Sequence, residues 1–374
     1  MSLSAAELAR YSRHLLLSEV GRAGQERLRA ARVLVVGAGG LGSPAALYLA
    51  ASGIGTLGIV DCDAVDVSNL QRQVLFATQD VGRPKALAAR EHLAALNPEI
   101  RVVAHALELD GANVTEIVNQ YDVVVDGSDR IATRYLVNDA CVIFGKALVS
   151  AAIYRFEGQA MTYLPGRGPC YRCLFPHAAA DAAASCAEAG VLGVLPGVLG
   201  TIQATEVIKI VLGHGELLLG RLLAYDALEM RFREFSFARR PDCAVCGDHP
   251  GITAPSDAAA GCEVRAPGLA AQSLAAMLAE VVPGGPTVQL VDVREPHEFI
   301  AGHLAGALSM PLGELERRLP ELARDATVVF LCRSGARSAR AVAIAAGRGV
   351  ARATHLAGGL LAWAAAIDPA LPLA

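Results

Sequence analysis

The chain has 374 residues, of which 53% are hydrophobic and 19% are charged, and its formal net charge is −4. This length exceeds one ordinary domain and the composition is that of a well-packed globular protein, so two folded domains are expected. The slightly acidic balance argues against a general nucleic-acid binder.

The first residues lack a basic stretch followed by an apolar core, and no long apolar run is free of charges and glycine breaks. These features predict a cytoplasmic protein with no signal peptide and no membrane partner. The nine cysteines are an odd number in such a chain, which argues against a disulfide framework. Metal binding and thiol chemistry are therefore the expected uses of cysteine.

The first predicted element is helical, because residues 4–30 place apolar side chains at the spacing of an amphipathic cover helix. A β–turn–α–β unit follows, in which an apolar run from Val33 meets the turn Gly-Ala-Gly-Gly-Leu-Gly. In that turn Gly37 permits the tight bend, Gly39 lets the backbone approach a phosphate, and Gly42 lets helix and strand pack closely. The N-terminus of the helix that follows this turn also favours the binding of an anion, through its free backbone N–H groups and its dipole.

The unit ends at Asp61, which is placed to accept hydrogen bonds from ribose hydroxyls. By itself the glycine pattern favours a dinucleotide site for NAD or FAD. Arg72 and Lys85 favour ATP instead, because they lie just beyond the acidic strand end, where a triphosphate would extend. Two surface cations beside a loop are the alternative interpretation.

A further strand–helix–strand repeat covers residues 100–125, and its last strand ends in Asp126-Gly-Ser-Asp129. Ligands bind at the C-terminal ends of strands in open α/β sheets, so a carboxylate here could hold Mg²⁺ that bridges phosphates. Both acids could instead cap the helical residues 131–144. The repeated pattern predicts a Rossmann-like, doubly wound α/β domain with a nucleotide site.

The remainder of this domain is expected to begin with strands over residues 147–163, with a turn at Glu157-Gly158. A loop-rich stretch and the glycine-rich run 190–200 come next, followed by a helix over 201–212. Further strands are expected as far as Phe237.

Two Cys-x-x-Cys pairs, far apart in the sequence and surrounded by turn residues, lie in the same domain. One such pair could be a redox motif. Two pairs supply the four thiolates of a closed, tetrahedral structural Zn²⁺ site. The sequence therefore predicts a zinc site whose ligands are Cys170, Cys173, Cys243 and Cys246.

Residues 251–264 lack periodicity and are expected to be a linker between a first domain, 1–250, and a second domain, 265–374. The second domain has the pattern of a small α/β unit. Its expected elements are a helix at 270–280 and buried strands at 287–293 and 327–331.

The last of these strands runs directly into Cys332-Arg-Ser-Gly-Ala-Arg-Ser338 and a helix. Such a turn aims backbone N–H groups and the helix dipole at the cysteine sulfur, and Arg333 and Arg337 add positive charge. These features favour a thiolate or persulfide anion on Cys332. A buried structural cysteine is the alternative, whereas a Cys-x₅-Arg phosphatase loop does not fit because position 338 holds serine.

Specific motifs spread over nearly the whole chain make it resemble a known fusion. Its first 250 residues or so resemble the ThiF/MoeB/HesA family, the bacterial relatives of ubiquitin-activating enzymes, and the rest resembles a rhodanese domain, a combination of the MoeZ type. The motifs are Gly-Ala-Gly-Gly-Leu-Gly, Asp-Val-Ser-Asn-Leu-Gln-Arg-Gln, Val-Gly-Arg-Pro-Lys, Asp-Val-Arg-Glu, Cys-Arg-Ser-Gly-Ala-Arg-Ser and both cysteine pairs.

This resemblance implies ATP-dependent adenylation of the C-terminal glycine of a ubiquitin-like sulfur carrier protein, of the ThiS or MoaD type. Rhodanese persulfide sulfur would then convert that terminus to a thiocarboxylate, with a cysteine desulfurase or thiosulfate as sulfur donor. A homodimer that uses ATP, Mg²⁺ and Zn²⁺ is also implied. Carriers for thiamine, molybdenum cofactor, cysteine and tRNA thiolation all remain open.

The same resemblance implies roles for single residues. Asp61 would bind the ribose, Asp129 would sit near Mg²⁺, and Arg13 matches an arginine that such homodimers contribute to the neighbouring subunit's nucleotide. The groups that would surround the phosphates are Gly37, Gly39, Gly42, Asn69, Arg72 and Lys85.

The implied sulfur chemistry places a persulfide on Cys332, and Cys186 matches the family's conjugating cysteine and is the candidate second thiol. In one departure, Arg130 stands where the family usually has an amide. Three other functions are weighed: an NAD- or FAD-linked oxidoreductase, which Arg72 and Lys85 disfavour, a scaffold that binds a ubiquitin-like protein without activating it, and an enzyme that conjugates the carrier to lysines.

Overall fold

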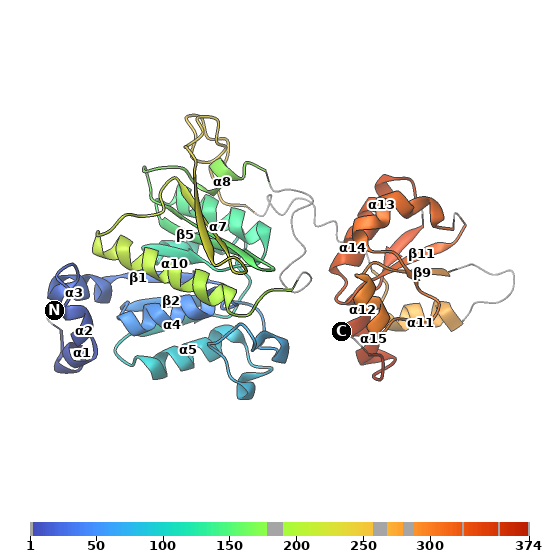
Figure 1. The fold of residues 1–374 in the computed structure, drawn as a ribbon, viewed down its shortest axis with the longest axis horizontal. Coiled ribbons are helices and arrows are strands. Elements are labelled where there is room, and N and C mark those ends of the chain that lie inside the picture. Colours follow the sequence, from blue (N-terminus) through green and yellow to red (C-terminus); the bar gives the residue numbers. More distant parts are fainter. Residues whose placement is uncertain are drawn as a thin grey trace. The chain divides into compact units, whose positions relative to one another are not determined.

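The computed structural model describes residues 3–177, 190–256, 268–279, 288–323, 325–350 and 352–372. The chain divides into two compact units, Met1–Gly261 and Cys262–Ala374, which are coloured from blue to yellow and from orange to red in Figure 1. The boundary falls inside the stretch 251–264 that the sequence predicts as a linker, of which residues 257–264 lie outside the described part.

The first unit is built on an eight-stranded sheet with the order β3-β2-β1-β4-β5-β6-β7-β8. The five strands from β3 to β5 run parallel, and the last three are added antiparallel. The winding direction reverses between β1 and β4, which confirms the Rossmann-like α/β class. The strands are β1 (Arg32–Val36), β2 (Thr56–Val60), β3 (Arg101–His105), β4 (Val123–Asp126), β5 (Ala147–Tyr154), β6 (Glu157–Tyr163), β7 (Arg221–Asp226) and β8 (Arg231–Ser236).

Helices cover both faces of this sheet (Figure 1). Val33 and Val35 of β1 pack against one group of helices, because side chains alternate along a strand. Leu34 and Val36 pack against the other group. The first group is α4 (Gly42–Ser52), α5 (Lys85–Leu96) and α10 (Leu195–Leu212), and the second is α6 (Val114–Asn119) and α7 (Ile131–Ile143).

The N-terminal segment is helical as predicted, but it forms three short helices instead of one. The first ends at Tyr11, whose backbone leaves the helical region and whose buried hydroxyl accepts a hydrogen bond of 2.8 Å from Asn97. The third begins at Gly21, which has a φ of +53°. The helices are α1 (Ala5–Arg10), α2 (Ser12–Leu15) and α3 (Gly21–Ala30).

Helix α10 begins six residues before the predicted start, so half of the glycine-rich run is helical. A Cβ on Gly200 would lie 2.4 Å from the carbonyl oxygen of Leu41, which means that this glycine lets α10 pack closely on the chain before α4. By length and composition α10 could span a membrane, yet half of it is buried inside the protein, as in the core helix of a folded domain.

The turn between β5 and β6 lies at Arg155-Phe156, where Arg155 has a φ of +53°, and not at the predicted Glu157-Gly158. Gly158 belongs to β6, and a Cβ there would lie 2.6 Å from a methyl group of Leu199. Glycine at this position therefore serves close packing between strand and helix, which sequence patterns do not distinguish from a turn.

The second unit has a parallel four-stranded sheet in the order β10-β9-β11-β12 with helices on both faces. Its strands are β9 (Val288–Asp292), β10 (Leu308–Ser309), β11 (Thr327–Leu331) and β12 (Ala353–His355). Its helices are α11 (Ala271–Ala279), α12 (Pro296–Ala301), α13 (Leu315–Arg318), α14 (Ala336–Gly347) and α15 (Gly359–Ala366). The small α/β unit expected from the sequence is therefore present.

Candidate functional site

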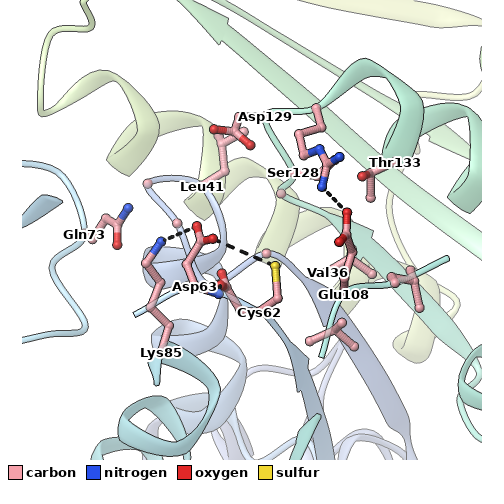
Figure 2. A pocket seen from close by; sticks show the side chains of 18 of the residues that line it. Val36, Leu41, Cys62, Asp63, Gln73, Lys85, Glu108, Ser128, Asp129 and Thr133 are labelled. Atoms are coloured by element: carbon pink, nitrogen blue, oxygen red, sulfur yellow. Dashed lines mark hydrogen bonds and ion pairs between the residues drawn. The ribbon is translucent and has the colours of Figure 1, made fainter. Parts of the chain in front are cut away.

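A pocket of about 150 Å³ lies at the C-terminal ends of β1, β2 and β4, where the winding of the sheet reverses. Open α/β sheets bind ligands at this point. Figure 2 shows side chains from several segments converging on it. Six of the residues that the sequence singles out line the pocket: Gly37, Gly39, Asp61, Arg72, Lys85 and Asp129.

The glycine-rich turn forms the floor of this pocket. Gly37 has a φ of +86°, which favours glycine, and a Cβ on Gly42 would lie 1.8 Å from the carbonyl oxygen of Gly37. Gly42 is not part of the pocket wall, so its role is to pack helix against turn. A Cβ on Gly39 would meet only Gln73, at 3.8 Å, which leaves this backbone open to a ligand.

Asp61 accepts hydrogen bonds from the backbone N–H groups of Ala38 at 2.8 Å and Asp63 at 2.9 Å. Burial raises the pKa of Asp61, although the charge of Lys85 and both hydrogen bonds oppose the rise. The carboxylate therefore ties the end of β2 to the glycine turn. Each oxygen keeps a second lone pair that could accept a hydrogen bond from a ligand hydroxyl.

The two cations reach the pocket from different segments. Lys85 is the first residue of α5, is only 5% exposed, and places its Nζ 2.9 Å from a carboxylate oxygen of Asp63. Arg72 is half-buried and donates to the carbonyl oxygen of Ser68 at 3.0 Å. The burial of Lys85 does not fit the alternative of two simple surface cations, because only Arg72 of the two keeps substantial exposure, whereas the Lys85 ammonium is buried and paired with Asp63.

The two acids after β4 differ in their surroundings. Asp126 is buried and accepts hydrogen bonds from the hydroxyls of Ser128 at 2.6 Å and Ser150 at 2.8 Å, so it organises the strand end. Asp129 is exposed and lines the pocket. The alternative that these acids cap α7 is wrong, because the residue at the N-cap is Arg130 and no side chain caps the helix.

Arg130 also lines the pocket, where its guanidinium pairs with the carboxylate of Glu108. Asn69 and Arg13 do not line it. The side chain of Asn69 accepts a hydrogen bond from the Asp66 N–H at 3.3 Å, and Arg13 lies exposed on α2. Cys186 lies outside the residues that the structure describes.

Gln73 is a pocket residue to which the sequence analysis assigned no role (Figure 2). It is 4% exposed, and its side-chain oxygen has no hydrogen-bond partner among the described residues. Buried polar atoms are nearly always hydrogen-bonded, so this atom is suited to meet a ligand or water. Its signal in the sequence is its place at the end of the motif Asp-Val-Ser-Asn-Leu-Gln-Arg-Gln.

The four cysteines of the two pairs come together, with all sulfur atoms within 4.8 Å of one another. The Sγ–Sγ distances are 4.0 Å for Cys170–Cys173, 3.6 Å for Cys170–Cys243 and 3.4 Å for Cys173–Cys246. Sulfurs bound at about 2.3 Å to a tetrahedral ion lie about 3.8 Å apart, so the arrangement is close to that of a zinc centre.

The surroundings hold this cluster in place. Cys170 precedes the short helix α8 (Tyr171–Leu174), whose first N–H donates to Asn138 of α7 at 2.9 Å. Arg172 of the same helix makes two hydrogen bonds of 2.7 Å to Asp139. The second pair follows β8, so an ion at the cluster would join that segment to α8.

Three thiols of this cluster have shifted pKa values. Hydrogen bonding with Cys246 raises the pKa of Cys170 far above the usual range of a thiol, and burial raises the pKa of Cys173 to about 11. A hydrogen bond from Cys170, together with others from Cys173 and Cys243, lowers the pKa of Cys246 to about 5. A divalent cation bound by all four sulfurs would stabilise their thiolate forms.

In the second unit Cys332 is fully buried at the end of β11, and its sulfur accepts two backbone hydrogen bonds. The N–H of Gly335 lies 3.1 Å and that of Ser338 lies 3.4 Å from Sγ. Gly335 has a φ of +97° and is the N-cap of α14, so the loop directs the start of the helix at the sulfur.

The sequence predicts that Arg337 adds positive charge at Cys332, but in the structure this charge is paired. Its guanidinium donates two hydrogen bonds, of 2.6 and 2.8 Å, to the carboxylate of Glu298 on α12. Because this carboxylate balances the guanidinium, Arg337 adds little net positive charge at Cys332. The backbone N–H groups remain as the donors that favour an anionic sulfur.

Comparisons with known proteins match both units of the chain. The ThiF family matches residues 11–245, and the rhodanese-like domain matches residues 271–366. A probable adenylyltransferase/sulfurtransferase MoeZ of Mycobacterium tuberculosis is 45% identical over 98% of this chain and 95% of its own length. A sulfur carrier protein adenylyltransferase of Thermus thermophilus is 54% identical over 69% of this chain and 98% of its own.

Among solved structures, E. coli MccB with ATP has a TM-score of 0.57 and 28% sequence identity, covering 65% of this chain and 75% of that chain. The relatives named here transfer adenylyl groups or sulfur, so the interpretation as an oxidoreductase finds no support. The chain belongs to the ThiF family and joins that domain to a rhodanese-like domain, the combination found in the adenylyltransferase/sulfurtransferases.

Proposed function

We propose that the protein adenylates the C-terminal glycine of a ubiquitin-like sulfur carrier with ATP and then converts that terminus to a thiocarboxylate. The observation that carries this proposal is the presence, in one chain, of a pocket lined by Asp61, Arg72 and Lys85 and of an anion-stabilising loop around Cys332. The names of the relatives support it, since one gives both activities and another gives a sulfur carrier protein as what it acts on.

In the first step a carboxylate oxygen of the carrier attacks the α-phosphorus of ATP. The new P–O bond forms as the bond to pyrophosphate breaks, and pyrophosphate leaves with the electron pair. This step needs alignment and charge neutralisation instead of a protein nucleophile. Lys85 and Arg72 would meet the phosphates, and Asp61 would hold the ribose.

Two further contributions complete the nucleotide site. Asp129, the exposed acid of the pocket, would hold Mg²⁺, whose charge further neutralises the phosphates. Neither Asn69 nor Arg13 lines the pocket of its own chain. The resemblance to the ThiF family implies that a second copy in a homodimer would contribute Arg13. Asn69 would reach the phosphates from the segment that precedes Arg72.

In the second step the terminal sulfur of a Cys332 persulfide attacks the carbonyl carbon of the acyl adenylate, and AMP leaves. The product is an acyl disulfide between the carrier and Cys332. A second thiol, for which Cys186 is the candidate, or an external reductant then attacks Sγ of Cys332. The S–S bond breaks, the thiocarboxylate leaves with the electron pair, and reduction of the resulting disulfide restores both thiols.

The cysteine cluster would bind Zn²⁺ through Cys170, Cys173, Cys243 and Cys246. Four sulfur ligands leave no open position for a substrate, so the ion would be structural. The proposal also includes a cytoplasmic location and a sulfur donor such as a cysteine desulfurase or thiosulfate. The carriers considered are those of molybdenum-cofactor and thiamine biosynthesis.

The test is intact-mass analysis of ThiS- and MoaD-type carriers after incubation with the full chain, ATP, Mg²⁺ and thiosulfate. The expected result is the mass gain that accompanies replacement of one terminal oxygen by sulfur, together with carrier-dependent exchange of pyrophosphate into ATP. The proposal would be rejected if no carrier of either type supported exchange or gained mass.

A further inference from the structure

Besides the two backbone donors, two buried polar side chains lie near Cys332. The first contacts its sulfur and the second contacts the first. Ser338 comes from α14 and His355 from β12. The Oγ of Ser338 lies 3.4 Å from Sγ of Cys332 and 3.4 Å from Nδ1 of His355. Cys332 and Ser338 are 0% exposed and His355 is 8% exposed. Burial of such groups costs free energy unless they are hydrogen-bonded, so their arrangement constrains the hydroxyl of Ser338.

The hydroxyl of Ser338 has one proton and three groups within reach that can accept it. The carbonyl oxygen of Gly335 lies 3.0 Å away, and the other two are the sulfur of Cys332 and, in the tautomer without a proton there, Nδ1 of His355. When the sulfur is a thiol, its S–H donates to Ser338 and the hydroxyl donates to Gly335. When the sulfur is an anion, the hydroxyl can rotate and donate to it, which adds a third donor to the N–H groups of Gly335 and Ser338.

His355 contacts the same hydroxyl, because its Nδ1 lies 3.4 Å from Oγ of Ser338. In the tautomer with an N–H at Nδ1 the imidazole donates to the Ser338 oxygen and cannot accept its proton, so only the Gly335 carbonyl and the sulfur compete for that proton. We propose that Ser338 donates a hydrogen bond to the anionic sulfur of Cys332, and that His355 is a positioning residue that holds the Ser338 hydroxyl for this purpose. The inference deepens the sulfurtransferase half of the proposed function and rests on it.

The Ser338 donor would act in the step that transfers sulfur from thiosulfate to Cys332. The Cys332 thiolate attacks the outer sulfur of thiosulfate, a bond forms between Sγ and that sulfur, and the bond to sulfite breaks. Sulfite takes the electron pair, so no oxidant or reductant is consumed, and the thiol proton has already passed to water. Since Sγ is anionic before the step and the charge lies on the outer sulfur after it, the Ser338 hydroxyl stabilises the attacking thiolate.

The test compares four variants of the full chain, Ser338→Ala, Ser338→Thr, His355→Phe and His355→Asn. The readout is the pH dependence of the rate constant for alkylation of Cys332 by iodoacetamide, followed on the Cys332 peptide by mass spectrometry so that other cysteines do not contribute. Threonine keeps the hydroxyl, and the asparagine amide replaces the N–H of the imidazole. The charged groups around the sulfur, Glu298, Arg333 and Arg337, stay unchanged throughout.

Losing one hydrogen bond to the anion makes the thiolate about tenfold less favourable relative to the thiol. The midpoint of the pH profile should therefore move up by about one pH unit in Ser338→Ala and His355→Phe. In Ser338→Thr and His355→Asn the midpoint should stay within about 0.3 pH unit of the unchanged chain. As controls, Ser273→Ala on the exposed face of α11 and His303→Asn should not alter the rate.

Two results would overturn the inference: folded Ser338→Ala and His355→Phe variants whose pH profiles keep the original midpoint, or conservative variants whose midpoints shift as far as those of these two. Thermal unfolding identifies any variant that does not fold, and Ser338→Ala decides the matter if His355→Phe fails. Alkylation needs neither thiosulfate nor a carrier. A chain that alkylates as expected but transfers no sulfur would therefore contradict the proposed function and not this inference.

Discussion

Two hydrogen bonds, of 2.6 and 2.8 Å, join the guanidinium of Arg337 to the carboxylate of Glu298, and both side chains are largely buried. Burial alone would raise the pKa of Glu298, but hydrogen bonds from Arg337 and from the N–H of Glu295 hold that pKa below its ordinary value. The pair connects α12 to the start of α14, and so it fixes the loop that carries Cys332.

Glu298→Gln is expected to lower the free energy of unfolding of the second unit by about 3 kcal/mol, because it leaves a buried guanidinium without its counter-charge. The chain has a single tryptophan, Trp363, which is buried in this unit, so urea unfolding can be followed by its fluorescence. As a matched control, Glu316→Gln removes a pair with Arg348 in which both side chains are more than 60% exposed, and it should cost less than about 1 kcal/mol. Equal losses would contradict the importance of burial.

The proposed zinc centre predicts about one equivalent of zinc in the purified chain. Cys243→Ser should remove most of this zinc and loosen the segment after β8, because one of four thiolates is lost. Metal analysis of the purified chain measures the zinc, and limited proteolysis measures the loosening. Cys62→Ser provides the control, since Cys62 is exposed and lies outside the cluster. Retention of a full equivalent of zinc by the Cys243 variant would exclude the proposed centre.

The two chemical steps should separate by mutation. Cys332→Ala should keep carrier-dependent exchange of pyrophosphate into ATP while forming no thiocarboxylate, because adenylation needs no thiol. Asp129→Ala should lower exchange about a hundredfold or more, as expected when charge stabilisation in the transition state is lost. Loss of exchange in the Cys332 variant would show that the steps are not independent, and an active Asp129 variant would remove its assigned role.

Gln73→Leu should weaken adenylation without weakening the fold. The amide oxygen has no partner among the described residues, so an apolar side chain of similar size loses no hydrogen bond of that atom within the protein. A lost hydrogen bond to a substrate should lower kcat/KM for exchange about tenfold.

Gln203→Leu is the matched contrast to this variant. Gln203 is equally buried, but its Nε2 donates to the carbonyl oxygens of Asp126 at 2.7 Å and Val149 at 3.2 Å. This second substitution should lower the melting temperature of the first unit. A Gln73 variant that is destabilised to the same degree but fully active would show that Gln73 is structural.

Asp80 should make the first unit sensitive to acid. Burial by itself would raise the pKa of Asp80, but the Ala77 N–H at 2.9 Å, His92 at 2.7 Å and Arg83 at 2.9 Å donate to the carboxylate and lower that pKa overall. A carboxyl group with a lowered pKa stabilises the folded state fully above its unfolded pKa of about 3.9, and this stabilisation is lost as the pH falls below it.

Asp80→Asn removes this titration, so the stability difference between the two chains should shrink as the pH falls from 6 to 3. Chemical unfolding at each pH, followed by circular dichroism, measures this difference. A difference that does not change with pH would mean that the carboxylate charge contributes nothing.

The local pattern of apolar and polar residues predicted many of the strands and helices. Apolar alternation and β-branched runs predicted the parallel strands, because each strand must present both faces to covering helices. Element boundaries such as those of α7 and β11 came within a residue of the prediction. The steric need for glycine at Gly37 and Gly42 was also predictable, since it depends only on the backbone of one turn.

Contacts between residues far apart in the sequence decided the cysteine cluster, the pairing of Arg337 and the role of two glycines. The sequence showed two cysteine pairs, but only the folded chain brings sulfurs 73 residues apart to within 4 Å. Likewise, Arg337 shows a positive charge in the sequence, whereas Glu298, 39 residues earlier, balances it in the structure. Glycines at 158 and 200 resemble turn residues locally, yet they allow a strand and a helix to pack closely. The sequence by itself thus determined the elements and the kinds of chemistry, because these depend on neighbours in the chain. Tertiary structure decided which charges are balanced and which polar atoms face a pocket, because these depend on residues that only folding brings together.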